Sequence, residues 1–392
     1  MKSAFIFLLI IIIAIACSKK NIPTQSSNSF KPDTSTQNTT RRRTSSNPVL
    51  VSPSVAIDSI VLTKNYYKEG LNEFKNMLVG TIPLSFKRSV FITENAFAEN
   101  SLNYEDFNKE IARIIDICKR VLAANNISYD DKVARNWSIF HYMCDTIPYT
   151  NGGHHYPFRY DYEDYFGQND WTKMFVVKLL ITGSGNCHSL PSLYKILSEV
   201  MDSEAYLSTA PNHMYIQHKD KKGDWFNVEL TSGTFPLDGW IRSSTYITHD
   251  AIVNGLYMRD LNLKESVVIC LVDLAKGYER KFGKGDDFIF DCVNLALKYD
   301  TLNINARLMR AEILKDRYRK YVNQNSQSFD TDIVKLNTAH ALQEVMKSEY
   351  FKIADLGYRE MPENMYMEWL TSITKQKEKY ENKKVNFNVT SK

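Results

Sequence analysis

Three residues in the middle of the chain have side chains suited to nucleophilic chemistry: Cys187, His213 and Glu229. A thiolate is a strong nucleophile, an imidazole can take up and return a proton, and a carboxylate can orient the imidazole. These residues lie far apart in the sequence. The set can work only if the surrounding segments bring the three side chains together.

The segment that follows Cys187 predicts a helix that begins close to the thiol. Leu190, Leu193 and Leu197 recur at helical spacing. Pro191 lies inside this pattern, and proline fits without cost only in the first turn of a helix. The helix must therefore begin at about residues 187–189, after a glycine-rich turn. Free N–H groups and the positive end of the helix dipole would favour a thiolate there.

The stretch from 210 to 231 predicts two β-strands joined by a turn. A hairpin symmetric about Lys221 would pair His213 with Glu229 and place Asn227 on the same face. Directly opposed residues on one face have Cβ atoms about 5 Å apart. The pattern therefore predicts a Cys-His-acid set. The alternative for each residue taken alone is a structural role in the core.

Three segments together resemble the transglutaminase-like proteins, a branch of the papain-like fold. Gly185–Leu190 is similar to that family's nucleophile segment, and Asn212–Tyr215 is similar to its histidine strand. Trp225–Thr231 resembles its W-x-x-x-D-P-T strand, with Glu229 in place of Asp and Leu230 in place of Pro. The motif match covers roughly residues 171–240.

This resemblance implies an α+β domain with a papain/transglutaminase-like fold, in which the nucleophile helix packs on an antiparallel sheet. It also implies that Cys187 attacks an amide or ester carbonyl, with His213 as base and then acid. Glu229 would orient the imidazole, or Asn227 would if Glu229 faces elsewhere. The oxyanion would be held by the Cys187 backbone N–H and by one side-chain donor, for which the candidates are Gln168, Asn186 and Trp171.

Composition and motifs argue against several other functions. The chain of 392 residues has a formal net charge of only +4, which gives no case for nucleic acid as a partner. Zinc or another metal could in principle use His154, His155, His188, His213, Cys187 and Asp161. However, no HExxH motif and no close-spaced cysteine pair supports a metal site. The run Gly183–Gly185 lacks the Lys-Ser/Thr of a phosphate loop, so we expect no cofactor.

The N-terminus predicts an export signal and a lipid anchor. The apolar run Ala4–Ala16 is too short to span a bilayer and is typical of a signal peptide. It ends in Ala14–Cys17, which resembles a bacterial lipoprotein cleavage box in which Cys17 is lipidated. The alternative is an ordinary secretory signal with an incidental cysteine. We expect a cell-envelope protein, anchored through Cys17 to a bacterial membrane, with the outer membrane preferred.

The rest of the chain divides by composition and periodicity. We expect a signal peptide at 1–17, a Ser/Thr/Asn-rich tether at 18–56, a transglutaminase-like domain at 57–263, a helical domain at 264–382 and a frayed tail at 383–392. Helices are predicted at 265–282, 286–299, 303–320 and 332–348. Residues 296–303 resemble the end of a tetratricopeptide-type repeat, an arrangement known after transglutaminase-like domains. The remaining cysteines lie in apolar helical patterns and are expected in the core: Cys118, Cys144, Cys270 and Cys292.

Two classes of function remain. The first is thiol-dependent hydrolysis or acyl transfer on a peptide, a protein or a cell-wall peptide. The second is a non-catalytic binding or scaffold lipoprotein, in which the cleft and the C-terminal helices hold a protein partner. A fold alone does not decide between them.

Overall fold

The computed structural model describes residues 53–149, 152–362, 364–369, 371–372 and 375, with side chains from residue 60 onward. Cys17, the predicted signal peptide, most of the tether and the tail lie outside the described residues. Residues 53–56, which composition assigned to the tether, form the start of helix α2 (Pro53–Val79). Proline suits this first helical position because its missing N–H needs no partner there. The described residues belong to one compact unit.

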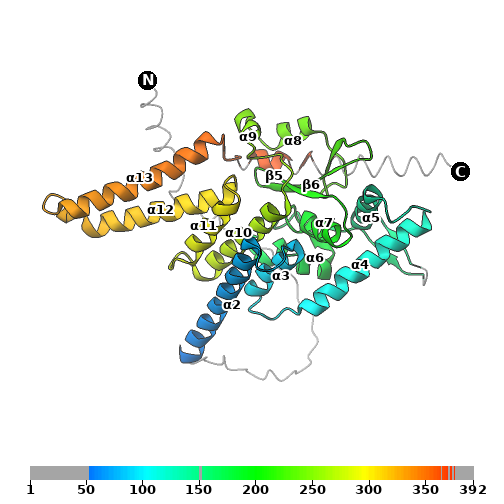
Figure 1. Ribbon diagram of the computed structural model, residues 1–392, viewed down its shortest axis with the longest axis horizontal. Coiled ribbons are helices and arrows are strands. Elements are labelled where there is room, and N and C mark those ends of the chain that lie inside the picture. The colour runs from blue at the N-terminus through cyan, green and yellow to red at the C-terminus, as the bar shows by residue number, and fades with distance from the viewer. Residues whose placement is uncertain (1–52, 150–151, 363, 370, 373–374, 376–392) are drawn as a thin grey trace, which may run out of the picture. The chain divides into compact units, whose positions relative to one another are not determined.

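Helices make up most of the described chain (Figure 1). After α2 they are α3 (Phe86–Phe97), α4 (Tyr104–Ala124), α5 (Lys132–Cys144), α6 (Val176–Thr182), α7 (Ser189–Val200), α8 (Asp238–Ser244), α9 (His249–Val253), α10 (Leu263–Phe282), α11 (Phe288–Tyr299), α12 (Ile304–Asn325) and α13 (Ile333–Asp355). The 3-10 helices are η1 (Trp171–Met174) and η2 (Ser326–Ser328). Among the described residues, no helix is both long enough and apolar enough to cross a bilayer.

Short strands form three small sheets. They are β1 (Ile147–Pro148), β2 (His154–His155), β3 (Arg159–Tyr160), β4 (Ser184–Gly185), β5 (Tyr206–Ala210), β6 (His213–Lys219) and β7 (Trp225–Val228). β1 pairs antiparallel with β2, and β3 pairs parallel with β4. β5, β6 and β7 form an antiparallel sheet in that order, and α7 packs on β5 and β6. The predicted α+β class, with a helix after Cys187 on an antiparallel sheet, is confirmed.

The helix ends follow from local sequence. Asn103 caps α4 and Asp131 caps α5, since each side chain accepts two backbone N–H groups from the first turn. Asn262 and Glu265 form a reciprocal capping box at the start of α10. The helices predicted in the C-terminal part are confirmed as α10 to α13, of which the last two extend further than expected. α10 packs against α2 and α3, and α12 lies beside α13 (Figure 1).

The register of the hairpin differs from the prediction. The observed pairs include Lys219 with Trp225 and Gln217 with Asn227, so the turn is centred on residue 222 and not on Lys221. The Asp220 carboxylate sets this turn by accepting the backbone N–H groups of residues 222 and 224 at 2.8 and 2.9 Å. Each residue of β6 therefore pairs with a residue two positions further along the chain than predicted. Because side chains alternate between faces with a period of two, each predicted residue keeps its face.

A close approach at Gly185 shapes the turn before Cys187. A Cβ at this position would lie 2.5 Å from Ser189 Oγ and 2.9 Å from a Leu179 methyl carbon. Ser189 Oγ also accepts the Asn186 backbone N–H at 3.0 Å. The missing side chain of Gly185 therefore lets the chain enter α7 tightly.

We expect Gly185→Ala to lower the free energy of unfolding by about 1–3 kcal/mol, because the added methyl group overpacks this turn. Urea unfolding of the full chain measures the effect. Gly239→Ala is the matched control, since nothing lies within 4 Å of a Cβ at Gly239 in α8. Equal stability of the two variants would contradict the steric role assigned to Gly185.

Candidate active site

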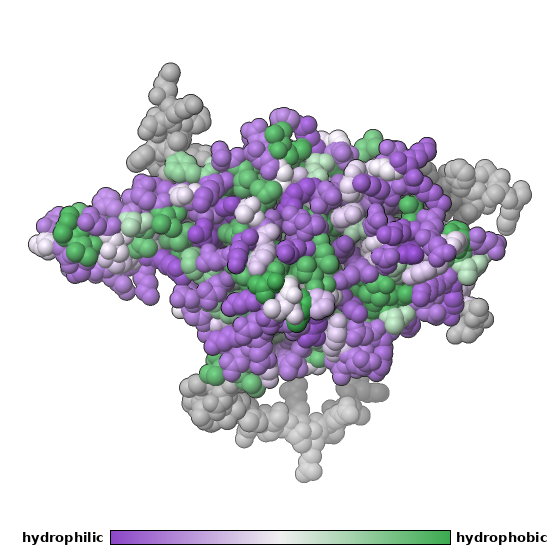
Figure 2. Space-filling view, in the orientation of Figure 1, coloured by the Kyte–Doolittle hydropathy of each residue, from purple (hydrophilic) through white to green (hydrophobic). Residues whose placement is uncertain are grey.

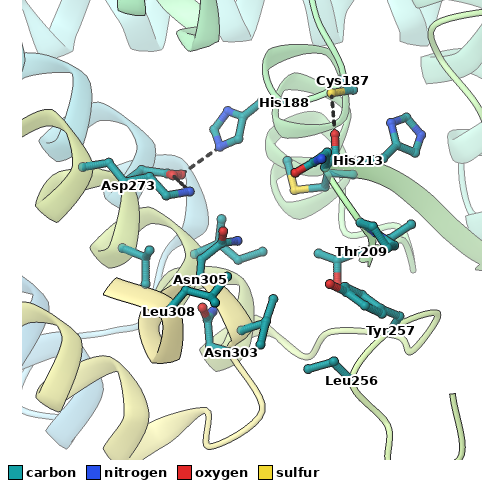
Figure 3. Close-up of a pocket in the computed structure, with 18 of the residues that line it drawn as sticks. Cys187, His188, Thr209, His213, Leu256, Tyr257, Asp273, Asn303, Asn305 and Leu308 are labelled. Carbon is teal, nitrogen blue, oxygen red and sulfur yellow. Dashed lines mark hydrogen bonds and ion pairs between the residues drawn. The ribbon is translucent and has the colours of Figure 1, made fainter. Parts of the chain in front are cut away.

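Cys187 lies directly before α7, which begins at Ser189. The start of this helix falls within the predicted range, and Pro191 occupies its first turn. The Cys187 Sγ lies 3.8 Å from the backbone oxygen of Asn212, the residue before β6 (Figure 3). The backbone N–H of Cys187 has no acceptor among the described residues. The N-terminal end of α7 thus presents both a thiol and a free donor.

His213 and Glu229 form a buried ion pair. The His213 Nε2–H donates to Glu229 Oε2 at 2.6 Å, and both side chains are almost fully buried. Thr231 holds the other carboxylate oxygen through its backbone N–H at 3.0 Å and through its hydroxyl. In the observed register the two partners are diagonal neighbours and not directly opposed. The long glutamate side chain spans this diagonal.

The charges at this pair are strongly coupled. Burial alone would lower the pKa of His213, but the Glu229 carboxylate and interactions with Cys187 outweigh it and raise the pKa to about 10. Burial alone would raise the pKa of Glu229, but the His213 charge and the Thr231 hydrogen bonds lower it. Both effects favour an imidazolium beside a carboxylate at neutral pH.

The second ring nitrogen of His213, Nδ1, does not bind Glu229 and is available to the thiol. Nδ1 is buried and has no hydrogen bond of normal geometry among the described residues. The Cys187 thiol is close enough for its hydrogen bonding and charge to contribute to the raised pKa of His213. The structure therefore brings Cys187, His213 and Glu229 together in the predicted order.

Two aromatic residues from the C-terminal part, Tyr366 and Trp369, cover this group; we call them the aromatic cover. The Trp369 ring meets the His213 ring edge-on, with centroids 4.5 Å apart, and Tyr366 lies 5.2 Å from Trp369. They are only 2% and 3% exposed, and Cys187 and His213 are each 6% exposed. The Trp369 Nε1 is buried without a hydrogen-bond partner among the described residues.

Tyr160 completes the buried surroundings of the thiol. It lies on β3 opposite Gly185 of β4. Burial, the charge of Cys187 and the neighbouring Tyr366 raise the pKa of the Tyr160 hydroxyl. Its oxygen has no hydrogen bond of normal geometry among the described residues. No pattern in the sequence distinguishes Tyr366 or Trp369, because aromatic residues are common in this chain.

A cavity of about 620 Å³ opens beside the thiol, a size suited to a small ligand or a few peptide residues. Cys187 and His213 line it, together with Tyr165 and Phe166 from the segment before η1. Figure 3 shows the remaining wall, which comes from α10, from the start of α12 and from the segment around Tyr257. The wider surface in Figure 2 is mainly hydrophilic, with apolar residues in small groups.

The predicted oxyanion donors have other positions or partners. The Asn186 carbonyl oxygen accepts two backbone N–H groups at the start of α7, at 3.0 Å each, and its amide donates to the Tyr165 backbone oxygen and to Met174 Sδ. Asn186 therefore caps the helix. Gln168 is exposed and does not line the cavity, whereas Trp171 does line it.

Asn227 does not contact the imidazole. Its side chain accepts a hydrogen bond from Gln217 and donates to the Pro236 backbone oxygen and to Asp238. It therefore ties the sheet to the segment before α8. Within the described residues, Glu229 is the group that orients His213.

A second histidine–carboxylate pair lies next to the thiol. His188 Nδ1 donates to the Met174 backbone oxygen at 3.0 Å, and its Nε2 donates to Asp273 of α10 at 2.8 Å (Figure 3). Because both partners are acceptors, the ring must carry two protons. Burial alone would lower the pKa of His188, but Asp273 raises it overall. This pair, which the sequence did not predict, joins α10 to the nucleophile segment.

The other described cysteines do not line this cavity. Cys118, Cys270 and Cys292 are buried and Cys144 is half-buried, and none of the five described cysteines forms a disulfide with another of them. No group of three or more His, Cys, Asp or Glu side chains in the described part of the chain is arranged to hold a metal ion. Comparisons with family models, with curated proteins and with solved structures find no match to this chain.

Proposed function

We propose that this chain is a thiol-dependent enzyme of the transglutaminase-like class that cleaves or transfers the acyl group of an amide. The observation that carries the proposal is that Cys187 and His213 line one cavity and that His213 is held by Glu229 in a buried ion pair. A paired imidazolium favours the thiolate, and the thiolate is the nucleophile.

The residues suggest a sequence of steps. The Cys187 thiolate attacks the amide carbonyl carbon, and the carbonyl electron pair moves to oxygen. The free backbone N–H of Cys187 donates to this oxyanion, and the unpartnered hydroxyl of Tyr160 is our candidate for the second donor. His213 then protonates the leaving nitrogen as the C–N bond breaks, which leaves a thioester. Water or an amine, deprotonated by His213, releases the acyl group.

The proposed location and the proposed partners are inferred from the sequence. We propose a lipoprotein of the bacterial cell envelope, anchored through Cys17, that acts on a peptide, a protein or a cell-wall peptide. The papain/transglutaminase-like fold and the tetratricopeptide-like character of the last helices belong to the same proposal. The chain needs no cofactor for these steps, because nucleophile, base and orienting acid are all side chains of its own.

A non-catalytic binding protein is the second candidate. The observation in its favour is the low exposure of Cys187 and His213 beneath the aromatic cover. In that case the thiol would be a core residue, and the cavity and C-terminal helices would hold a partner.

Alkylation of Cys187 by iodoacetamide between pH 5.5 and 9.5 separates the two candidates. We expect iodoacetamide to label Cys187 of the full chain faster at pH 6.5 than it labels Cys187 of His213→Ala, because the proposed mechanism pairs the attacking thiolate with the His213 imidazolium. In His213→Ala the rate at pH 6.5 should fall by up to about a hundredfold relative to pH 8.5, as for an ordinary thiol. Peptide mass spectrometry assigns the label to Cys187.

Cys144→Ser is the control, because it removes a half-buried thiol that does not line the cavity. Its Cys187 profile should match that of the unmodified chain. A wild-type profile that rises tenfold per pH unit and is unchanged in His213→Ala would reject the enzyme and favour the binding protein.

A further inference from the structure

The cavity beside Cys187 is lined by more arginine and lysine side chains than carboxylates. Its lining contains four basic residues outside the histidines: Arg259, Lys276, Arg280 and Arg359. It contains three carboxylates: Asp273, Glu279 and Asp300. The arginine and lysine charges therefore exceed the carboxylates before any histidine is counted.

Each carboxylate already has a cationic partner. Asp273 accepts from His188 at 2.8 Å, and Asp300 pairs with Arg259 at 2.9 Å. Glu279 lies 3.4 Å from Lys284, which is not part of the lining. None of the three is left to repel an anionic ligand without compensation.

Two arginines have no carboxylate partner among the described residues. The Arg280 guanidinium lies over the Trp171 ring at 4.3 Å, and the Arg359 guanidinium lies over the Tyr246 ring at 4.8 Å. Stacking fixes the plane of a guanidinium and leaves its N–H edge available for a bidentate contact with a carboxylate. Lys276 is only loosely paired, 3.7 Å from an Asp273 oxygen.

We infer that this cavity binds a carboxylate of the substrate, so that the preferred substrate is a peptide with an acidic side chain or terminal carboxylate close to the scissile amide. The inference rests on the proposed function and names the substrate class for that site. Arg280 and Arg359 are its specificity-determining residues, because they add positive charge to a cavity whose acids are already neutralised. Carboxylate and phosphate are the two groups that a guanidinium binds best, because each can accept two parallel N–H donors.

Two alkylating reagents with the same leaving group test this inference. Iodoacetate carries a carboxylate and iodoacetamide a neutral amide, and in both the thiolate sulfur displaces iodide. We measure second-order rates at Cys187 of the full chain at pH 7 and low salt, and normalise their ratio to that of N-acetylcysteine amide. The ratio should favour iodoacetate by about tenfold, as expected for a cleft whose unpaired charges are positive.

The double variant Arg280→Gln/Arg359→Gln should bring the ratio close to that of the reference thiol. Arg242→Gln on α8 is the matched control, because Arg242 is exposed and does not line the cavity. If the double variant does not fold, salt serves instead: in 1 M NaCl the Debye length falls to about 3 Å, and the wild-type preference should disappear.

The outcomes separate the inference from the proposal beneath it. Normal labelling by iodoacetamide with no preference for iodoacetate would overturn the carboxylate site and leave the enzyme proposal standing. Failure of both reagents to label Cys187 at pH 7 would overturn the enzyme proposal and, with it, this inference. A preference for iodoacetate that persists in 1 M NaCl or in the folded double variant would also overturn the inferred carboxylate site.

Discussion

Replacing Tyr366 and Trp369 with alanine is expected to speed alkylation of Cys187 by roughly ten- to a hundredfold. The aromatic cover packs on the His213 ring and leaves the thiol only 6% exposed. Burial of one large apolar side chain is worth about 1.5–3 kcal/mol, and 1.4 kcal/mol changes a population tenfold. Removing the cover should therefore raise the fraction of molecules in which a reagent reaches Cys187.

A buried polar atom of the cover supports this expectation. The Trp369 Nε1 gives up hydration without gaining a hydrogen-bond partner among the described residues. Such a group costs about 1–3 kcal/mol, which offsets part of the aromatic packing. The cover is therefore held less strongly than its buried area implies.

Glu368→Ala is the matched control for the cover, because Glu368 lies on the same turn and is exposed. Its labelling rate should equal that of the unmodified chain. Circular dichroism of the double variant confirms that the helices remain. If the folded double variant labels at the wild-type rate, the cover does not limit access, and the reagent reaches Cys187 from the cavity alone.

Replacing Glu229 with glutamine is expected to cost about 3–5 kcal/mol of the free energy of unfolding near pH 6, because it removes one partner of a buried ion pair. His213 would remain buried without its carboxylate. The same change should lower the pKa of His213, because Glu229 is the largest of the influences that raise it. Urea unfolding at several pH values measures both effects.

The pH dependence has a definite sign. The folded-state pKa of His213 is raised from its ordinary value of 6.5, so its contribution to stability is complete below pH 6.5 and is lost as the pH rises towards about 10. The folded-state pKa of Glu229 is lowered from 4.5, so its contribution is present above pH 4.5 and is lost as the pH falls further. The deficit of Glu229→Gln should be largest between about pH 4.5 and 6.5 and should shrink towards pH 10.

Glu204→Gln provides the comparison. Glu204 pairs with Lys132 at 3.0 Å, but both side chains are about half exposed, and such pairs contribute about 0–1 kcal/mol. Glu204→Gln should change the free energy of unfolding only slightly over the whole pH range. Similar small effects from both glutamine variants would show that the pair with His213 contributes no more than a surface ion pair.

Local physical chemistry explains how much of this site the sequence predicted. Pro191 restricted the start of α7 to within two residues, because proline tolerates only the first turn. The period-two alternation of strands kept His213 and Glu229 on one face even though the predicted register was wrong by two residues. The turn itself was misplaced because the Asp220 carboxylate binds two backbone N–H groups beyond it.

The sequence by itself thus determined the α+β class, the start of the helix after Cys187, the approximate bounds of helices α10 to α13, and the identity of a thiol, an imidazole and a carboxylate as candidate site residues. These follow from periodicity, capping and turn residues, which act over a few positions along the chain. Only the tertiary structure decided that Asp273 pairs with His188, that Tyr366 and Trp369 cover the thiol, and that two arginines line the cavity without a carboxylate partner among the described residues. The reason is that these contacts join segments distant in sequence, and packing between helices, which leaves no local pattern, selects which of many aromatic and charged side chains meet.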